Sequence, residues 1–175
     1  MVMSDMQQQQ RNDEATVSFA ESFVMSDAFR ALFREGMALV ETTAAYLDGP
    51  GRDESRGLPR MLALAYASES MRLTTRLMQL ASWLLLQRAV AEGEISVSQA
   101  RSQKEKVKLS QQNPASSDDV MDALPGQLRD LVGQSLRLQA RIIHLDQLME
   151  GADQAPPDAN PVAMQRRLLE SAFGG

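Results

Sequence analysis

The sequence contains no cysteine, and this absence excludes several kinds of site at once. Without a thiol the chain forms no disulfide, carries no cysteine nucleophile and offers no thiolate ligand to a metal. Histidine is almost as scarce, because His144 is the only one in the chain. The Glu-x-x-His motif of helical-bundle di-iron proteins is also absent, since Arg141 stands where its glutamate is required. We therefore predict no metal and no cofactor.

Aromatic residues are also few, at 5% of the chain, and leucine, alanine and methionine supply most of the 43% that is hydrophobic. Sheets favour β-branched and aromatic residues, so this composition favours α-helices. The net charge of −5 argues against non-specific binding of nucleic acid, which requires a basic face. The first residues lack the basic-then-apolar pattern of a signal peptide, so we expect a cytoplasmic protein.

No stretch of the chain carries a catalytic signature. The sequence contains no glycine-rich dinucleotide or phosphate loop, no Gly-x-Ser-x-Gly elbow and no His-Glu-x-x-His zinc motif. Glu69, Arg72 and Arg76 lie three and four residues apart, a spacing that favours an intrahelical ion pair over an anion site. We therefore predict that the protein is not an enzyme.

The most apolar stretch runs from Arg72 to Val90, and it is the segment around which we expect the rest to pack. Glutamine and serine interrupt it, and it is shorter than the about 20 apolar residues that span a bilayer, so we predict no membrane insertion. Its first apolar side consists of residues at helical spacing: Leu73, Leu77, Met78, Leu80, Leu84, Leu85 and Ala89. A second stripe is expected on nearly the opposite side: Trp83, Leu86 and Val90.

A helix that is apolar on two sides needs cover on both. The other expected helices cover one side more readily than two. We therefore predict that Trp83, Leu86 and Val90 form the interface of a two-fold homodimer. The alternative is that the polar connector over residues 93–124 covers this stripe instead.

The periodic pattern predicts an all-α fold, a three-helix bundle of long antiparallel helices with flexible N- and C-terminal tails. The bundle is expected over residues 18–150, after a glutamine-rich disordered arm at residues 1–17. Its helices are expected over residues 18–48 or 26–48, then 58–92, then 125–150. Both Ser18 and Ser26 suit a helix start, and the pattern leaves this choice open.

The segments between the expected helices are polar. Asp48-Gly49-Pro50-Gly51 breaks the first helix, so residues 49–57 are expected to form a polar turn. Gly93 is expected to end the second helix and to open the connector over residues 93–124. Within this connector Ser98 suits the cap of a short, weak helix that would run through Lys108.

Beyond Gly151, where the third helix is expected to end, a proline-rich linker opens the tail, residues 151–175. Near its end lies a short amphipathic segment, the tail segment: Met164, Arg166, Arg167, Leu168, Leu169 and Phe173. It is too short to be a stable free helix. It is either a frayed end or a tethered peptide that orders on a partner. We prefer the second interpretation, because an apolar cluster beyond a linker has no core of its own to join.

Two stretches resemble the family called regulator of CtrA degradation, RcdA. The more specific one is ESMRLTTRLMQLASWLLLQRAVAEGEIS, from Glu69 to Ser96. The other is SDAFRALFREGMALVETTAAYLDG, in the first expected helix. The resemblance covers roughly residues 18–150, the part of the chain with a periodic pattern, and it includes the order of the helices.

This resemblance implies a three-helix protein that acts as a homodimer and as an adaptor in alphaproteobacterial cell-cycle proteolysis. The partners that it implies are protein cargo, the ClpXP protease primed by the response regulator CpdR, and a secondary adaptor such as the cyclic-di-GMP effector PopA. It also implies concentration at a cell pole. No binding residues are carried over from the family.

We therefore expect a non-enzymatic adaptor that tethers cell-cycle regulators, or a secondary adaptor, to the primed protease and acts by raising their effective concentration. The alternative is a helical structural or anti-regulator protein that sequesters a partner. A helical-bundle enzyme has little support, because an adaptor uses a tail segment of this kind and an enzyme does not need one.

Overall fold

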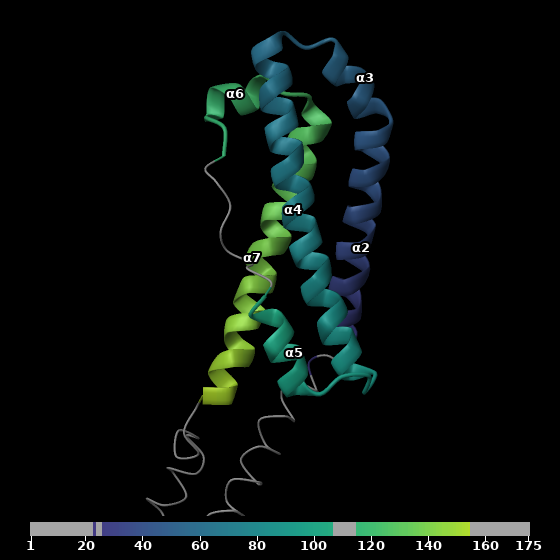
Figure 1. Cartoon of the computed structure of the whole chain (residues 1–175), viewed down its shortest axis with the longest axis vertical. Coiled ribbons are helices and arrows are strands. Elements are labelled where there is room, and N and C mark those ends of the chain that lie inside the picture. Colours follow the sequence, from purple (N-terminus) through teal and green to yellow (C-terminus); the bar gives the residue numbers. More distant parts are fainter. Residues whose placement is uncertain (1–22, 24–25, 107–114, 155–175) are drawn as a thin grey trace, which may run out of the picture. The chain divides into compact units, whose positions relative to one another are not determined.

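The structure is a computed structural model that describes Phe23, residues 26–106 and residues 115–154. All regular structure within these residues is helical, so the all-α prediction is confirmed. The chain divides into two parts, and the packing described below is that of the part from Phe23 to His144. Its long helices are labelled in Figure 1: α2 (Asp27–Asp48), α4 (Arg60–Ala91) and α7 (Gly126–Gln154), which continues beyond His144.

The start of α2 is fixed by a side-chain cap. The hydroxyl of Ser26 accepts a hydrogen bond from the backbone N–H of Phe29 at 3.3 Å, which satisfies one of the free N–H groups at the helix start. Of the two expected starts, α2 uses Ser26, and Ser18 lies outside the described residues. α2 also lies very close to α4, since a Cβ atom on Gly36 would stand 2.5 Å from Cδ1 of Leu84.

A short helix, α3 (Pro50–Arg56), replaces the polar turn that the sequence predicts over residues 49–57. The prediction of a turn is wrong because Pro50 breaks α2 but also suits the first turn of a new helix. The connection between α2 and α4 is therefore helical and not an irregular turn.

Gly51 is the residue that lets α3 pack against the ends of α2 and α4. A Cβ atom at this position would lie 2.6 Å from the hydroxyl of Tyr66 and 2.8 Å from the backbone oxygen of Tyr46. The Tyr46 hydroxyl in turn donates a hydrogen bond to Glu54 of α3 at 2.9 Å. Only glycine fits this corner without moving the backbone.

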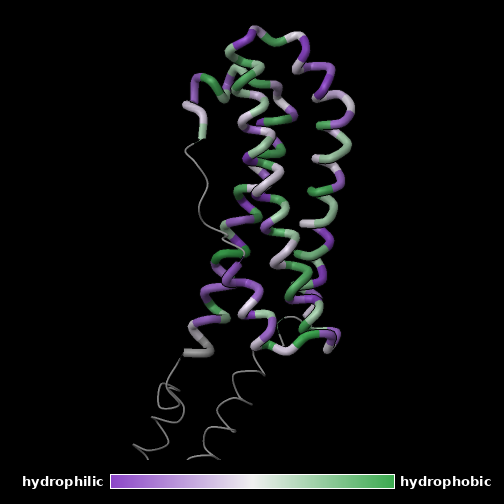
Figure 2. Tube along the Cα trace, in the orientation of Figure 1, coloured by the Kyte–Doolittle hydropathy of each residue, from purple (hydrophilic) through white to green (hydrophobic). Residues whose placement is uncertain are grey.

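α4 spans Arg60–Ala91, where a helix is expected over residues 58–92. It ends at Ala91, and Gly93, two residues further on, has a φ of 72°, a left-handed conformation that glycine adopts without strain. Figure 2 shows hydrophobic and hydrophilic residues alternating along α2, α4 and α7. The buried residues of α4 recur at steps of one, three and four: Tyr66, Glu69, Leu73, Arg76, Leu77, Leu80, Trp83, Leu84 and Gln87.

α2 runs antiparallel to both other long helices, but α4 and α7 run in the same direction (Figure 1). Arg76 of α4 contacts Ser135 of α7, and further along both helices Leu84 and Leu138 lie beside the same residue of α2, Gly36. The prediction of antiparallel helices is therefore correct for α2 relative to α4 and α7, but not for α4 relative to α7. The reason is the connector, which carries the chain back along α4 before α7 begins.

The connector contains two short helices in its described residues, α5 (Val97–Lys104) and α6 (Asp118–Ala123). α5 packs against the last turns of α4, and α6 lies near the opposite end of α4 (Figure 1). The cap of α5 is Ser96, which forms a capping box with Gln99, and not Ser98 as the sequence suggested. α5 also ends at Lys104, before the expected Lys108.

α7 passes through Gly151, where the sequence predicts its end, and reaches Gln154. Among the described residues, no atom lies within 4 Å of where a Cβ atom of Gly151 would be, and a glycine within a helix costs about 1 kcal/mol relative to alanine. The expected disordered arm (residues 1–17) and tail residues 155–175 lie outside the described residues.

The corner around Gly51 gives a first prediction. Gly51→Ala should lower the free energy of unfolding by about 1–3 kcal/mol, because the added methyl group overlaps a backbone oxygen that cannot rotate away. Thermal unfolding followed by circular dichroism measures this effect. Gly57→Ala is the matched control: a Cβ atom there makes one ordinary contact at 3.7 Å and should change stability little. Equal effects of the two substitutions would contradict the close packing of α3.

Candidate interaction surface

α4 is the centre of the described bundle, because α2, α3, α5 and α6 all pack against it and α7 is hydrogen-bonded to it. Three of its side chains are charged and lie between its ends without being fully exposed: Glu69, Arg72 and Arg76. Two of them, Glu69 and Arg76, are buried and form hydrogen bonds with other segments, so they lie on the side of α4 that faces its neighbours.

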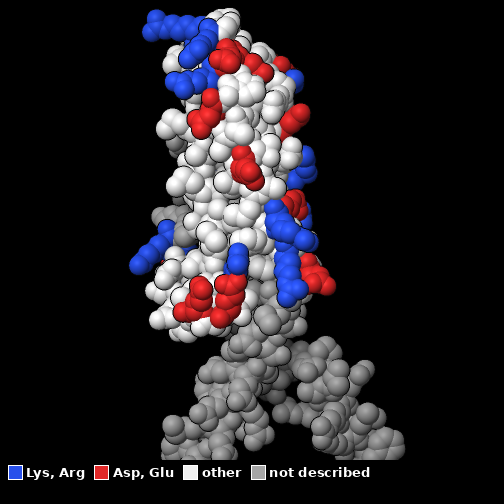
Figure 3. Space-filling model, turned by 90° about the vertical axis from the view of Figure 1, so that its right-hand side faces the viewer, with Lys and Arg blue, Asp and Glu red and all other residues white. Residues whose placement is uncertain are grey.

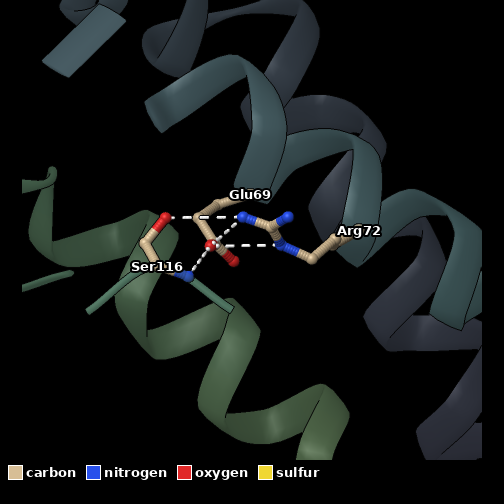
Figure 4. Close-up of polar contacts among 3 residues, drawn as sticks. All are labelled: Glu69, Arg72 and Ser116. Atoms are coloured by element: carbon tan, nitrogen blue, oxygen red, sulfur yellow. Dashed lines mark hydrogen bonds and ion pairs between the residues drawn. The ribbon is translucent and has the colours of Figure 1, made fainter. Parts of the chain in front are cut away.

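Glu69 anchors the returning connector to α4 (Figure 4). Its side chain is only 2% exposed, and its carboxylate accepts hydrogen bonds from Nε of Arg72 at 3.2 Å and from the backbone N–H of Ser116 at 2.8 Å. Arg72 also donates to the hydroxyl of Ser116 at 3.4 Å. The expected ion pair between Glu69 and Arg72 within the helix is confirmed. The carboxylate of Glu69 also binds Ser116, which is distant in sequence.

The protonation of Glu69 follows from these contacts. Burial alone would raise the pKa of this carboxyl group, because the charged form loses its hydration. The hydrogen bonds from Arg72 and Ser116 outweigh burial and lower the pKa from 4.5 to about 2. Glu69 is therefore ionised at neutral pH and stabilises the fold in that form.

Arg76 provides the polar contact between α4 and α7. One terminal nitrogen of its guanidinium donates a hydrogen bond to the hydroxyl of Ser135 at 2.8 Å, and this hydroxyl donates to the backbone oxygen of Val132 at 2.7 Å. Both side chains are buried, and burial lowers the pKa of Arg76. The charges of Glu69 and Arg76 thus serve contacts inside the bundle.

The predicted dimer stripe is not a continuous open surface. Trp83 is only 1% exposed in the single chain, and Leu86 and Val90 are half-buried. Trp83 follows Leu80 by three residues, so at 100° per residue it lies roughly 60° from this leucine and not opposite to it. The placement of Trp83 on an open face is therefore wrong, whereas an interface that uses Leu86 and Val90 stays a prediction.

The open side of α4 carries the large apolar residues instead. Most of the exposed large hydrophobic side chains of the described chain are on this helix: Met61 (75% exposed), Leu64 (56%), Met71 (72%), Met78 (66%) and Leu85 (52%). The sequence analysis assigned Met78 and Leu85 to the covered side. The signal that it missed is the seven-residue spacing of Leu64, Met71, Met78 and Leu85, which is the spacing of a coiled-coil seam.

A cleft of about 760 Å³ lies between the first turns of α2 and the last turns of α4. The guanidinium of Arg88 stands 5.2 Å from the ring centroid of Phe33 and donates a hydrogen bond to Glu92 at 2.7 Å. Arg30 is paired with Asp27 at 3.3 Å. Asp27 and Glu92 neutralise the charges of Arg30 and Arg88. The cleft therefore suits a peptide that carries charges of both signs better than a simple anion.

Other kinds of site find little support in the described residues. No group of three His, Asp or Glu side chains there is placed to hold a metal ion, and His144 is exposed. None of the described helices combines the length and apolar character that a bilayer span requires. On the side drawn in Figure 3, charges of both signs are scattered between uncharged areas. The predicted partner-binding residues of the tail segment lie outside the described residues.

A second prediction concerns Glu69. Glu69→Gln should lower the free energy of unfolding at pH 7 by roughly 2–3 kcal/mol, because it leaves Arg72 without its carboxylate. The folded pKa lies below the ordinary value of 4.5, so the contribution of Glu69 is present above pH 4.5 and is lost as the pH falls toward 2. The difference between the two proteins should therefore shrink over this range.

Urea unfolding followed by circular dichroism at pH 7, 4.5 and 3 measures this dependence. Glu41→Gln, at an exposed position of α2, is the matched control and should change stability little at any pH. A wild-type advantage over Glu69→Gln that is the same at pH 7 and at pH 3 would contradict the ionised anchor.

Two comparisons with known proteins place the chain in a family. A family model described as a protein of unknown function (DUF1465) matches residues 20–173. The crystal structure of RcdA from Caulobacter crescentus is similar to the chain with 48% sequence identity and a TM-score of 0.60, and the match covers 74% of this chain and 96% of RcdA. No curated protein matches significantly. The chain therefore belongs to the family described as DUF1465 and is a relative of RcdA.

Proposed function

We propose that this protein is a non-enzymatic adaptor that brings cell-cycle regulators, or a secondary adaptor, to the ClpXP protease. The observation that carries the proposal is the 48% identity to RcdA over nearly the whole of that chain. The resemblance of residues 69–96 to the family implies the partners: CpdR, which primes the protease, a secondary adaptor such as PopA, and protein cargo. The same resemblance implies a cytoplasmic protein that gathers at a cell pole.

The mechanism is tethering, in which one surface holds cargo and another holds the primed protease. The described residues offer two separate surfaces for this purpose. One is the exposed apolar side of α4, and the other is the cleft lined by Phe33 and Arg88. The helical scaffold needs no chemistry of its own, because the rate gain of an adaptor comes from the effective concentration of substrate at the protease.

The tail segment is the third proposed surface. The family model extends to residue 173, so it includes the apolar and basic residues of this segment. A segment that orders only on its partner loses conformational entropy on binding, which keeps its affinity moderate and its exchange fast. These properties suit a protein that must pass its cargo on.

The alternative function is sequestration of a single partner helix. The exposed apolar side of α4 supports it, because a face of this kind is a docking site for an amphipathic helix. The two functions predict opposite effects on a shared target. An adaptor accelerates degradation of the bound protein, whereas a sequestering protein slows it.

A third prediction tests the adaptor role directly. CtrA should be degraded several-fold faster by purified ClpXP with CpdR and PopA when this protein is added, because tethering raises the occupancy of the protease. Gel analysis of CtrA over time measures the rate, and the same mixture without CpdR is the control. An unchanged rate would refute the adaptor role, and a slower rate would favour sequestration.

A fourth prediction concerns the tail segment. Deletion of residues 162–175 should leave helicity and thermal stability almost unchanged and should weaken delivery of at least one cargo or secondary adaptor. Circular dichroism and the degradation assay on one preparation measure both effects. Alanine in place of Met164, Leu168 and Phe173 is the matched variant, because it keeps the length of the tail. Loss of stability would show that the segment is part of the core, and normal delivery of every cargo would show that it is a passive end.

A further inference from the structure

The cleft between the first turns of α2 and the last turns of α4, which we name the Phe33 cleft, has an apolar floor. Phe33 and Ala91 are half-buried there and lie beside the buried Phe29. The ring centroids of Phe29 and Phe33 are 6.3 Å apart, and Phe23 stands 6.1 Å from Phe29. Because Phe33 is only partly covered, the side chain of a ligand can extend this row of rings at the spacing of about 4.5–7 Å that aromatic pairs prefer.

Two of the three arginines that line the Phe33 cleft are neutralised by acids of the same helix. Arg30 pairs with Asp27 through Nη1, and Arg88 pairs with Glu92 through Nε. The charge of Glu94 also acts on Arg88. The charge that a ligand can answer must therefore come from the third arginine.

That third arginine, Arg34, is exposed and forms no ion pair with any residue that the structure describes. The acid next to it, Glu35, is already engaged, since its two carboxylate oxygens accept hydrogen bonds from Nη1 of Arg141 at 2.8 and 2.7 Å. A guanidinium binds a carboxylate through two parallel hydrogen bonds, which fixes the orientation of the bound group. Arg34 is thus a ready partner for a ligand carboxylate at the edge of an apolar floor.

We propose that the Phe33 cleft binds a short linear segment of a partner protein in which a leucine or an aromatic residue stands beside an aspartate or glutamate. The apolar side chain lies on the floor against Phe33, and the carboxylate pairs with Arg34. This inference rests on the proposed function, and it deepens that function by naming the kind of segment that a cargo or a secondary adaptor presents.

The size and the charge of the cleft disfavour other occupants. Its volume of about 760 Å³ is within the range of about 300–1,000 Å³ that is typical of ligand sites, so it accepts a few side chains. A basic segment would bring its cations against Arg34, and a small anion would leave the floor uncovered. A run of acids would be repelled by the net charge of −5, so an isolated acid in a segment of mixed charge is favoured.

A defined peptide tests this proposal with the full-length chain. The probe is the fluorescein-labelled peptide Gly-Lys-Ser-Leu-Phe-Asp-Ser, blocked at both ends, whose lysine keeps it free of net charge. Fluorescence polarisation should give a dissociation constant on the order of 100 μM. Asparagine in place of the aspartate should weaken binding about five-fold, because an exposed ion pair contributes modestly. Alanine in place of the leucine and phenylalanine should weaken it at least about 10-fold.

Charge reversal identifies the residue that reads the carboxylate. Arg34→Glu should weaken binding of the probe about 10-fold, and it should bind a peptide with lysine in place of the aspartate more tightly than the wild type does. Arg52→Glu is the matched control: it makes the same change of charge at an exposed position of α3, beyond the other end of α2, and should alter neither affinity by more than about two-fold. Circular dichroism checks that both variants keep their helicity.

Several outcomes would overturn the proposal. They are a wild type that does not bind the probe, equal binding of the asparagine or the alanine peptide, an affinity that Arg34→Glu leaves unchanged, and an equal loss in Arg52→Glu. The degradation assay reports separately on the adaptor role. A protein that binds the probe but does not accelerate degradation of CtrA refutes only that role, and one that accelerates degradation without binding the probe refutes only the assignment of the cleft.

Discussion

The buried carboxylate of Glu69 is the contact on which the arrangement of the long helices depends. It fixes Ser116, and thus the point at which the connector has returned along α4, by bonds to a charged group that is almost fully buried. From this point α6 and α7 follow, and α7 therefore runs parallel to α4. Arg76 and Ser135 then join the two helices by a second buried polar contact. An apolar core alone would tolerate other placements of α7, whereas these polar contacts are satisfied in one arrangement only.

α4 has two distinct sides, one that packs within the bundle and one that exposes large apolar residues. Its buried residues recur at steps of one, three and four, and its exposed residues Leu64, Met71, Met78 and Leu85 recur at steps of seven on the opposite side of the helix. The charged residues between its ends belong to the inner side. This departs from the usual amphipathic pattern, because the inner side of α4 combines apolar residues with the buried charges and its outer side is apolar as well.

Much of this fold follows from the sequence, and the differences have physical causes. The bounds of α4 lie within two residues of the expected 58–92, since Pro59 and Gly93 are strong local signals. The direction of α7 was not predictable, because a hydrogen bond between Glu69 and Ser116 leaves no periodic trace in the sequence. Trp83 was misplaced because it was assigned to the side opposite Leu80, although a step of three residues turns it only roughly 60° from this leucine. The seven-residue repeat of Leu64, Met71, Met78 and Leu85 was present in the sequence, but it was overlooked beside the core leucines.

The parallel run of α4 and α7 also has a consequence for how the chain folds. The pair of α2 and α4 is joined by the short α3, so it closes with little loss of chain entropy. α7 instead meets α4 through residues 59 positions apart, and Ser116 meets Glu69 across 47. Long-range contacts of this kind form later than local ones. We therefore expect the α2–α4 hairpin to form first, and docking of the connector and α7 to complete the native state.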